Sequence, residues 1–354
     1  MARRKHSAPR RGSLGVRPRK RASRFVPRVK SWPEVSLDSP RPLAFLGYKV
    51  GMTHVMMIND RPGTPTYGQE IFMPVTIVET PPMIPIAARF YKASTLGLKT
   101  LTEVWSTPPD DLQLWRRVKA LSIDEDKINK ARRKLERSID SVARVSLILA
   151  SQPRLTGGLS KKVPDLIEVK LGGGSVKDQI DYALGILGKP LRISDVFSEG
   201  QFIDVIGVTK GKGFQGVVKR FGVKELPKWN KQRKGSRRIG ARSPGIGTIS
   251  PTPQAGQMGM HRRTEHNKRL LAIRVVSDKD PSKDSAEIEK ILKEFTPVSA
   301  FPHYGLLRTD YVVVAGSLQG TPKRPLVLRW PVRPPRWVPT EAPKLTYVSL
   351  ESKI

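Results

Sequence analysis

Short apolar and β-branched segments, bounded by glycine and proline, recur along most of the chain. This pattern is typical of β-strands. It predicts strands at Ala44–Thr53, Glu70–Glu79, Ile86–Tyr91, Lys99–Trp105, Val145–Ala150, Leu166–Leu171, Phe202–Thr209, Tyr311–Ala315 and Leu326–Trp330.

Apolar residues at helical spacing predict three helices, two of them between Pro108 and Asp195. The first follows a capping box in which Ser122 is the N-cap and Glu125 reaches back to it. The second follows Ser175, and a third lies within Ser285–Phe295. The strands and helices of the middle region therefore predict an α+β unit inserted into a β-rich body.

One long segment, Lys210–Arg274, departs from this pattern. It holds 17 Lys/Arg and two acids, and no helical or alternating period runs through Lys224–Arg263. Within it, Ser243–Met260 has no charged residue and is rich in glycine and proline. A non-periodic segment of this length is either disordered or held by something outside the chain. We expect the uncharged part to be the deepest point of an extension that enters a partner.

The formal net charge of +33 is concentrated in this segment and in the first thirty residues, which hold 12 Lys/Arg and no acid. The other 259 residues carry only +6. Clustered Lys and Arg neutralise phosphates and release counterions, so the expected partner is a polyanion. The concentration predicts two nucleic-acid-penetrating extensions on a folded core, rather than a charge spread for solubility.

Several classes of site find little support. The chain has no cysteine, which excludes disulfides, thiol catalysis and cysteine-bound zinc. Its five histidines are scattered, and no cluster of carboxylates accompanies His261 and His266. We therefore expect no catalytic residue, no metal, no cofactor, no small-molecule substrate and no membrane span, and we expect the two histidines to contact phosphate or ribose.

The segment Gly211–Gly216 reads G-x-G-x-x-G after a predicted strand. A dinucleotide loop would continue into a helix, whereas the following Val217–Val223 is β-branched and is predicted not to open one. We expect the glycines to allow close approach of the backbone to RNA. Among the aromatic residues of this stretch, Phe214 and Phe221 are predicted to anchor a core, and Trp229 can either pack or stack on a base.

Several motifs occur in the order expected of one known family. They are FLGYKVGMT (Phe45–Thr53), TPP (Thr80–Pro82), VTKGKGFQGVVKRFG (Val208–Gly222), AGQMGMHRRT (Ala255–Thr264) and HYG (His303–Gly305). Together they resemble the large-subunit ribosomal protein L-three family, and the basic N-terminus resembles its archaeal and eukaryotic branch. The chain is shorter than eukaryotic members at its C-terminal end, which favours the archaeal type.

The resemblance implies a mainly β fold: a translation-protein-type β-barrel with an inserted α+β region and two long basic extensions. The corresponding domains are 1–42 (N-terminal extension), 43–107 and 196–330 (the barrel, with its loop at about 210–274), 108–195 (the insert) and 331–354 (a Pro-rich tail). It also implies a non-enzymatic, cytoplasmic protein of the large subunit. Such a protein binds large-subunit rRNA near its 3′ domain, supports early assembly and extends a loop toward the peptidyl-transferase centre. Its implied neighbours are large-subunit proteins fourteen and twenty-four.

The residues expected to contact rRNA are the cations of the two extensions and one histidine. They are Arg3, Arg4, Lys5, Arg10, Arg11, Arg17, Arg19, Lys20, Arg21, Lys210, Lys212, Lys219, Arg220, Lys228, Lys231, Arg233, Lys234, Arg237, Arg238, Arg242, His261, Arg262, Arg263, Lys268 and Arg269. The expected loop tip comprises Gly245, Gly247, Gln254, Gly256, Gln257 and Gly259.

The chain departs from its eukaryotic relatives at two places. Arg242 follows Ile239-Gly240-Ala241 where those relatives carry tryptophan, so the tryptophan contact is either absent or replaced by a contact of Arg242 with a phosphate or base. The relatives also carry a modified histidine in the region of Lys228–Gly235, and no histidine stands there in this chain. Two other functions compete on charge alone, a nucleic-acid-processing enzyme and a chromatin-type DNA binder. The enzyme would need clustered carboxylates or a cofactor loop.

Overall fold

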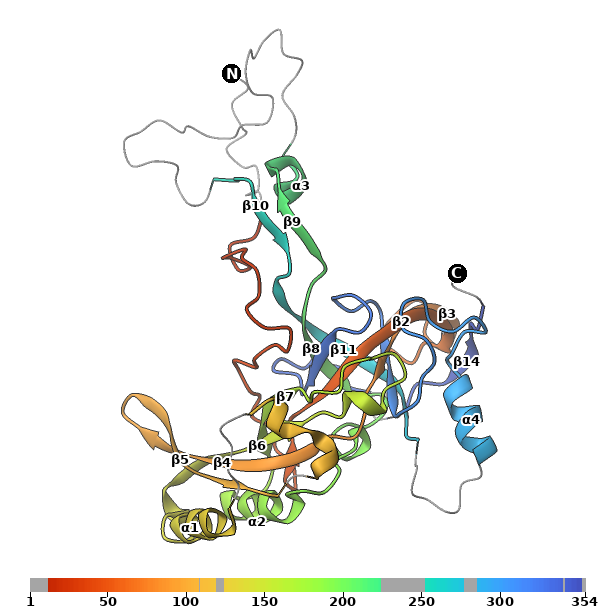
Figure 1. Ribbon diagram of the computed structural model, residues 1–354. Coiled ribbons are helices and arrows are strands. Elements are labelled where there is room, and N and C mark those ends of the chain that lie inside the picture. The colour runs from red at the N-terminus through yellow and green to blue at the C-terminus, as the bar shows by residue number, and fades with distance from the viewer. Residues whose placement is uncertain are drawn as a thin grey trace, which may run out of the picture. The chain divides into compact units, whose positions relative to one another are not determined.

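The computed structural model describes residues 12–107, 109–118, 124–223, 252–276, 285–339 and 341–351. Its residues separate into two compact units. We call Met1–Arg24 with Val208–Arg262 the basic unit, and Phe25–Gly207 with Arg263–Ile354 the body. The fold is mainly β, as predicted (Figure 1).

The larger sheet of the body has seven strands in the order β13-β8-β11-β12-β3-β2-β14. Strand β13 also pairs with β2, through Leu328 and Phe45 among others, so six of these strands form a closed ring. Strand β14 adds to the outside of the ring by pairing with the later part of β2. The strands are β2 (Ala44–Ile58), β3 (Glu70–Glu79), β8 (Phe202–Val208), β11 (Arg262–Arg274), β12 (Tyr311–Ala315), β13 (Pro325–Arg329) and β14 (Leu345–Val348).

The second sheet of the body is antiparallel and has the order β1-β7-β6-β4-β5. Its strands are β1 (Arg41–Pro42), β4 (Ile84–Ser94), β5 (Gly97–Trp105), β6 (Val142–Ala150) and β7 (Leu166–Gly172). Helix α1 (Glu125–Glu136) packs against β5, and helix α2 (Val176–Ile186) packs against β4 and β6 (Figure 1). This sheet draws strands from both sides of residue 108, so the α+β region of the structure includes β4 and β5.

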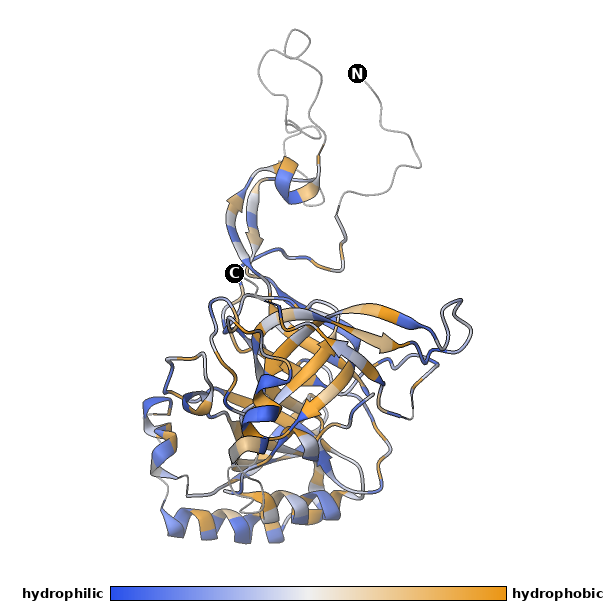
Figure 2. Cartoon of the chain, turned by 90° about the vertical axis from the view of Figure 1, so that its right-hand side faces the viewer, coloured by the Kyte–Doolittle hydropathy of each residue, from blue (hydrophilic) through white to orange (hydrophobic). Residues whose placement is uncertain are grey.

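Apolar side chains of both sheets form the core of the body. Phe45, Leu46 and Val205 from the closed ring share one buried cluster with Leu147 and Leu149 from the second sheet. Figure 2 shows the apolar residues concentrated on these strands. Their β-branched and aromatic composition suits a buried pleated surface, which is why the strand predictions hold.

The short helices of the body and α4 complete its structure. They are the 3₁₀ helices at Asp110–Leu112, Leu114–Arg116, Ile139–Ser141, Pro153–Leu155 and Ile193–Asp195, and helix α4 at Ser285–Lys293. No helix in the described ranges is long and apolar enough to cross a membrane.

Of the two predicted helix N-caps, one agrees with the structure and the other does not. Ser175 caps α2 as predicted, and Asp178 completes a capping box with it. The capping box at Ser122 is wrong, because α1 has Asp124 as its N-cap and Glu125 as its first residue, while Ser122 lies outside the described residues. Asp124 and Glu125 are both acidic, and either one stabilises the positive N-terminal end of the helix dipole. The sequence pattern alone therefore does not fix the first residue of the helix.

The basic unit is built on a two-stranded antiparallel ribbon of β9 (Gly211–Gln215) and β10 (Gly256–Gly259). A five-residue helix, α3 (Val217–Phe221), follows β9. The prediction that Val217–Val223 opens no helix is therefore wrong. Gly222 ends α3 in the left-handed conformation at φ 61° and donates its N–H to the Val218 carbonyl, so a C-cap overrides the β propensity of the valines.

Candidate nucleic-acid interface

The N-terminal arm, Gly12–Arg24, and the ribbon lie together within the basic unit. Two side chains make the main connection between them. Arg19 Nη1 donates to the Arg220 carbonyl at 2.8 Å, and Arg220 Nη2 donates to the Arg19 carbonyl at 3.2 Å. The arm is also held through its backbone, because the Ala22 N–H donates to the Met260 carbonyl at 2.7 Å.

Arg220 joins three segments of the basic unit at once. Besides its bond to the arm, its Nε donates to the Gln257 carbonyl at 2.9 Å and its Nη1 donates to the Gln254 carbonyl at 2.9 Å. Arginine carries five N–H donors in a fixed planar fork, so one side chain can satisfy several carbonyls at the same time. Arg220 therefore fixes α3 to β10 and to the arm.

The aromatic ring of Phe221 packs against the arginine side chains that join the arm to the ribbon. The guanidinium carbon of Arg19 lies 4.3 Å from its ring centroid, and those of Arg220 and Arg17 lie at 5.2 and 5.7 Å. These distances are within the range of cation–π attraction. Phe221 is therefore half-buried among arginine side chains rather than part of an apolar core. The prediction of a core position is also wrong for Phe214, since 77% of its surface is exposed.

The three arginines repel one another where they meet. Burial lowers the pKa of Arg220 below its ordinary value, and repulsion from Arg19 and Arg17 lowers it further. These residues line a cavity of about 480 Å³ with Phe221 and Gln254. A cavity lined by positive charge favours a negatively charged occupant, and guanidinium groups match phosphate oxygens in geometry.

His261 belongs to the framework of the same unit. Its Nε2 accepts the Gly259 N–H at 3.1 Å, which leaves Nδ1 to donate to the Lys20 carbonyl at 3.0 Å. Both ring nitrogens are therefore used within the protein, and the side chain is buried. The structure gives His261 a role in holding the arm to the ribbon, which the sequence reasoning did not foresee.

The glycines of the ribbon allow its two strands to approach closely. Gly259 has φ 76°, and a Cβ added there would lie 2.0 Å from the Lys210 carbonyl oxygen. A side chain at Gly256 would lie 2.9 Å from Nη1 of Arg220. The G-x-G-x-x-G segment thus forms one edge of a β-ribbon, paired with β10 at Gly211 and Gln215, rather than a loop around a nucleotide.

Other predicted contact residues have partners in the body. Arg269 is buried and forms a bidentate ion pair with Asp60, with 2.6 Å between its Nη1 and Oδ1. Lys268 lies 3.1 Å from Glu265. His266 donates from Nδ1 to the buried carboxylate of Asp204 at 2.9 Å. These contacts make Arg269 part of the buried structure of the body, whereas His266 remains exposed while it bonds to Asp204.

Asp204 organises the strands that lead into and out of the basic unit along the chain. It lies in β8 and accepts from Nη2 of Arg329 in β13 at 2.5 Å. It also accepts the backbone N–H groups of Asn267 in β11 at 3.1 Å and of Val332 at 3.2 Å. Burial by itself would raise the pKa of Asp204, but these hydrogen bonds and His266 outweigh it and hold the pKa below its ordinary value.

The remaining predicted residues divide into two groups. Lys20, Arg21, Lys210, Lys212 and Lys219 are exposed on the basic unit, Arg262 begins β11, and Arg263 follows it in the body. Outside the described residues lie Arg3, Arg4, Lys5, Arg10, Arg11, Lys228, Lys231, Arg233, Lys234, Arg237, Arg238, Arg242, Gly245 and Gly247, and also Trp229. In the described part of the chain, no group of three or more His, Asp or Glu side chains could hold a metal ion.

The similarity of the chain to known proteins decides its family. The model of the family described as Ribosomal protein L3 matches residues 1–353. The chain belongs to the ribosomal protein L3 family. It is 56% identical to the large ribosomal subunit protein uL3 of Aeropyrum pernix, over all of this chain and 99% of that protein. The uL3 proteins of Sulfurisphaera tokodaii and Sulfolobus acidocaldarius are 50% and 46% identical over the same shares.

Membership of the L3 family has direct consequences for the competing functions. The chain is a structural component of the large ribosomal subunit and not an enzyme. The resemblance found in the sequence motifs is thereby confirmed, and the processing-enzyme and chromatin alternatives fall away. An archaeal type of the protein is consistent with the archaeal relatives.

Proposed function

We propose that the basic unit is the element through which this L3 protein binds large-subunit rRNA. One observation carries the proposal. The described residues of the basic unit, 12–24, 208–223 and 252–262, contain ten Lys/Arg and not one acid. Lys and Arg without neighbouring carboxylates gain most from phosphate, because each phosphate contact also releases condensed counterions.

The folded arrangement of the basic unit supports the same conclusion. Arg220, Arg19 and His261 hold the arm against the ribbon through backbone carbonyls. The exposed Lys20, Lys210 and Lys212 are thereby carried on a shared framework. A framework ordered before binding lowers the conformational entropy that RNA binding would otherwise cost.

The finer points of the proposal rest on the family resemblance. The chain binds the rRNA near its 3′ domain, supports early subunit assembly, and extends its central segment toward the peptidyl-transferase centre. Its neighbours are large-subunit proteins fourteen and twenty-four, and its location is the cytoplasm. The closed ring of six strands corresponds to the translation-protein-type β-barrel of the family, and the pairing of β13 with β2 supports this correspondence.

The salt dependence of rRNA binding tests the proposal. If about ten cations of the extensions contact phosphates, the slope of log affinity against log salt should be about −7 to −9. Replacing Lys210 and Lys212 together by glutamine should make the slope shallower by about 1.4 to 1.8, because two phosphate contacts are lost. The measurement is a filter-binding titration of a 23S-type rRNA fragment at several salt concentrations.

A matched pair of cations on the body provides the control. Lys130 and Lys134 are exposed on α1, so their replacement by glutamine removes the same charge from a different unit. The slope for this variant should equal that of the unchanged protein. An equal reduction in both double variants, or a slope shallower than about −3 for the unchanged protein, would mean that the basic unit is not the binding surface.

A further inference from the structure

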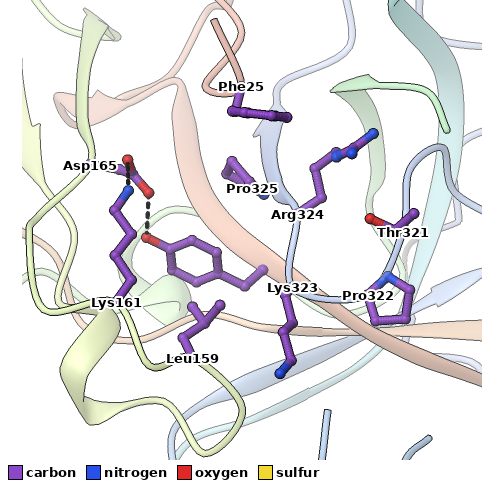
Figure 3. Close-up of a pocket in the computed structure, with 10 residues that line it drawn as sticks. Phe25, Leu159, Lys161, Asp165, Thr321, Pro322, Lys323, Arg324 and Pro325 are labelled. Carbon is purple, nitrogen blue, oxygen red and sulfur yellow. Dashed lines mark hydrogen bonds and ion pairs between the residues drawn. The ribbon is translucent and has the colours of Figure 1, made fainter. Parts of the chain in front are cut away.

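A cavity of about 300 Å³ lies in the body, apart from the residues of the basic unit. Most of the residues that line it are apolar, aromatic or cationic, and the others are one acid and one threonine (Figure 3). The lining residues are Phe25, Tyr48, Leu159, Lys161, Asp165, Thr321, Pro322, Lys323, Arg324 and Pro325. Its size is at the lower end of the range found for small-ligand sites, which suits an occupant no larger than one nucleotide.

The charge of this cavity is positive. Asp165 is its one acidic lining residue, and Lys161 forms an ion pair with it. The Tyr48 hydroxyl also donates to Asp165, at 2.9 Å. Figure 3 shows Lys161 and Asp165 together on one side of the cavity, away from Arg324. The carboxylate is therefore compensated by Lys161, and Arg324 and Lys323 add further positive charge.

Phe25 and Arg324 both line the cavity and contact each other. About 53% of the surface of Phe25 is exposed, and the guanidinium carbon of Arg324 lies 5.4 Å from its ring centroid. Figure 3 shows the Arg324 side chain extending toward the level of Phe25, whereas the Lys323 side chain leads away from it. Burial lowers the pKa of Arg324. The Arg324 guanidinium group therefore lies over the Phe25 ring, and a base can stack on the other face of the ring.

A strained turn holds Arg324 in this position. Lys323 adopts the left-handed conformation at φ 70°, which is unfavourable for a residue with a side chain. The turn is fixed because the Lys323 N–H donates to the Lys49 carbonyl at 2.7 Å and the Arg324 N–H donates to the Thr321 carbonyl at 3.3 Å. Backbone strain that the surrounding structure maintains occurs most often at binding and active sites.

We propose that Phe25 and Arg324 bind one unpaired rRNA nucleotide, whose base stacks on the ring and whose phosphate accepts hydrogen bonds from the guanidinium group. This proposal rests on the proposed rRNA-binding function and adds a contact on the body. Aromatic rings take any base by stacking, and arginine takes phosphate oxygens in pairs. An acidic peptide would use Arg324 but would leave the exposed ring of Phe25 without a matching group, so the combination favours a nucleotide.

The first test measures binding of a single-stranded RNA pentamer to the full chain in about 0.5 M salt, where phosphate contacts contribute less to affinity. Stacking persists under these conditions, so Phe25→Ala should reduce affinity roughly 5- to 150-fold, the equivalent of one stacked base. Phe25→Trp should restore it, because a larger aromatic ring still stacks. Arg324→Gln should weaken binding and make the salt slope shallower by about 0.7.

Phe72→Ala is the matched control. Phe72 is also a body phenylalanine, 59% exposed, and its ring lies 4.8 Å from that of His54 rather than in the cavity. Its replacement should leave pentamer affinity unchanged. Thermal unfolding of all variants checks that the body remains folded. If Phe25→Ala binds the pentamer as tightly as Phe72→Ala does, the nucleotide site is ruled out.

Crosslinking in assembled subunits provides a second readout. With 4-thiouridine incorporated in the rRNA, irradiation should attach a nucleotide to the peptide that contains Phe25, and Phe25→Ala should abolish that adduct. Adducts on other peptides of the chain but none on the peptide that contains Phe25 would overturn the proposal. A failure of the proposed function is distinguishable, because it would flatten the salt slope of the unchanged protein while leaving the Phe25 result unaffected.

Discussion

Replacing Arg220 by methionine is expected to release the N-terminal arm from the ribbon and to weaken rRNA binding. The change removes three hydrogen bonds, to the carbonyls of Arg19, Gln254 and Gln257. Bonds from a charged donor contribute about 1.5–3 kcal/mol each, so local opening of the arm should become easier by more than about 2 kcal/mol. Hydrogen exchange of the Ala22 amide, which bonds to Met260, should then accelerate by at least roughly thirtyfold.

Lys219→Met is the matched control for Arg220→Met. Lys219 precedes Arg220 in α3 and is exposed, so its replacement removes the same charge while the arginine remains. Both variants should lose a similar electrostatic part of rRNA affinity, but only Arg220→Met should accelerate exchange at Ala22. Equal exchange in the two variants would show that Arg220 does not hold the arm.

Replacing Asp204 by alanine is expected to destabilise the body by about 3–5 kcal/mol, because Arg329 would be left buried without its carboxylate partner. Only about 3% of the Arg329 side chain is exposed, and Asp204 is fully buried. Urea unfolding followed by tryptophan fluorescence measures the difference. The exposed pair of Lys293 and Glu289 on α4 offers a control, since Glu289→Ala should leave the free energy of unfolding nearly unchanged.

The pH dependence of stability gives Asp204 a second signature. Its folded-state pKa is below its ordinary value, so the unfolded chain takes up this proton at higher pH than the folded protein. The stabilisation is therefore complete above the unfolded pKa of about 3.9 and is lost as the pH falls through the lower folded value. Asp204→Asn should unfold less steeply with acid in that window. An unchanged acid profile would contradict the role assigned to Asp204.

The strands of the body could be predicted from the sequence because their information is local. Glu70–Glu79 is predicted and observed with the same bounds, since its β-branched residues suit a half-buried pleated surface. The motifs that carry the family are local as well. Strand patterns and family motifs can both be recognised within a few consecutive residues, without knowing which distant residues they contact.

The structure of the basic unit could not be predicted in this way. Arg19 and Arg220 are 201 residues apart in the chain, and their reciprocal bonds run to backbone carbonyls, which leave no residue pattern. The same holds for His261 and Lys20, so the sequence alone does not predict the bond between them. Charge indicates which segments we propose to bind a polyanion, but the order within them depends on long-range contacts.

The central claim is that the arm and the central extension form one unit that meets the rRNA together. The absence of natural cysteine allows a single introduced cysteine to carry an iron chelate that cleaves nearby RNA. Ser13→Cys and Lys219→Cys place it on the arm and on α3; a Cβ on Gly12, next to Ser13, would contact the Phe221 ring at 3.0 Å. Leu96→Cys, at the fully exposed tip between β4 and β5, places it on the body.

In assembled large subunits, the probes on Ser13→Cys and Lys219→Cys should cleave overlapping sets of rRNA nucleotides, because the two positions belong to the same folded unit. The probe on Leu96→Cys should give a different set. Cleavage by the arm and α3 probes at separate regions of the rRNA, or at none, would contradict the claim that the two segments bind as one.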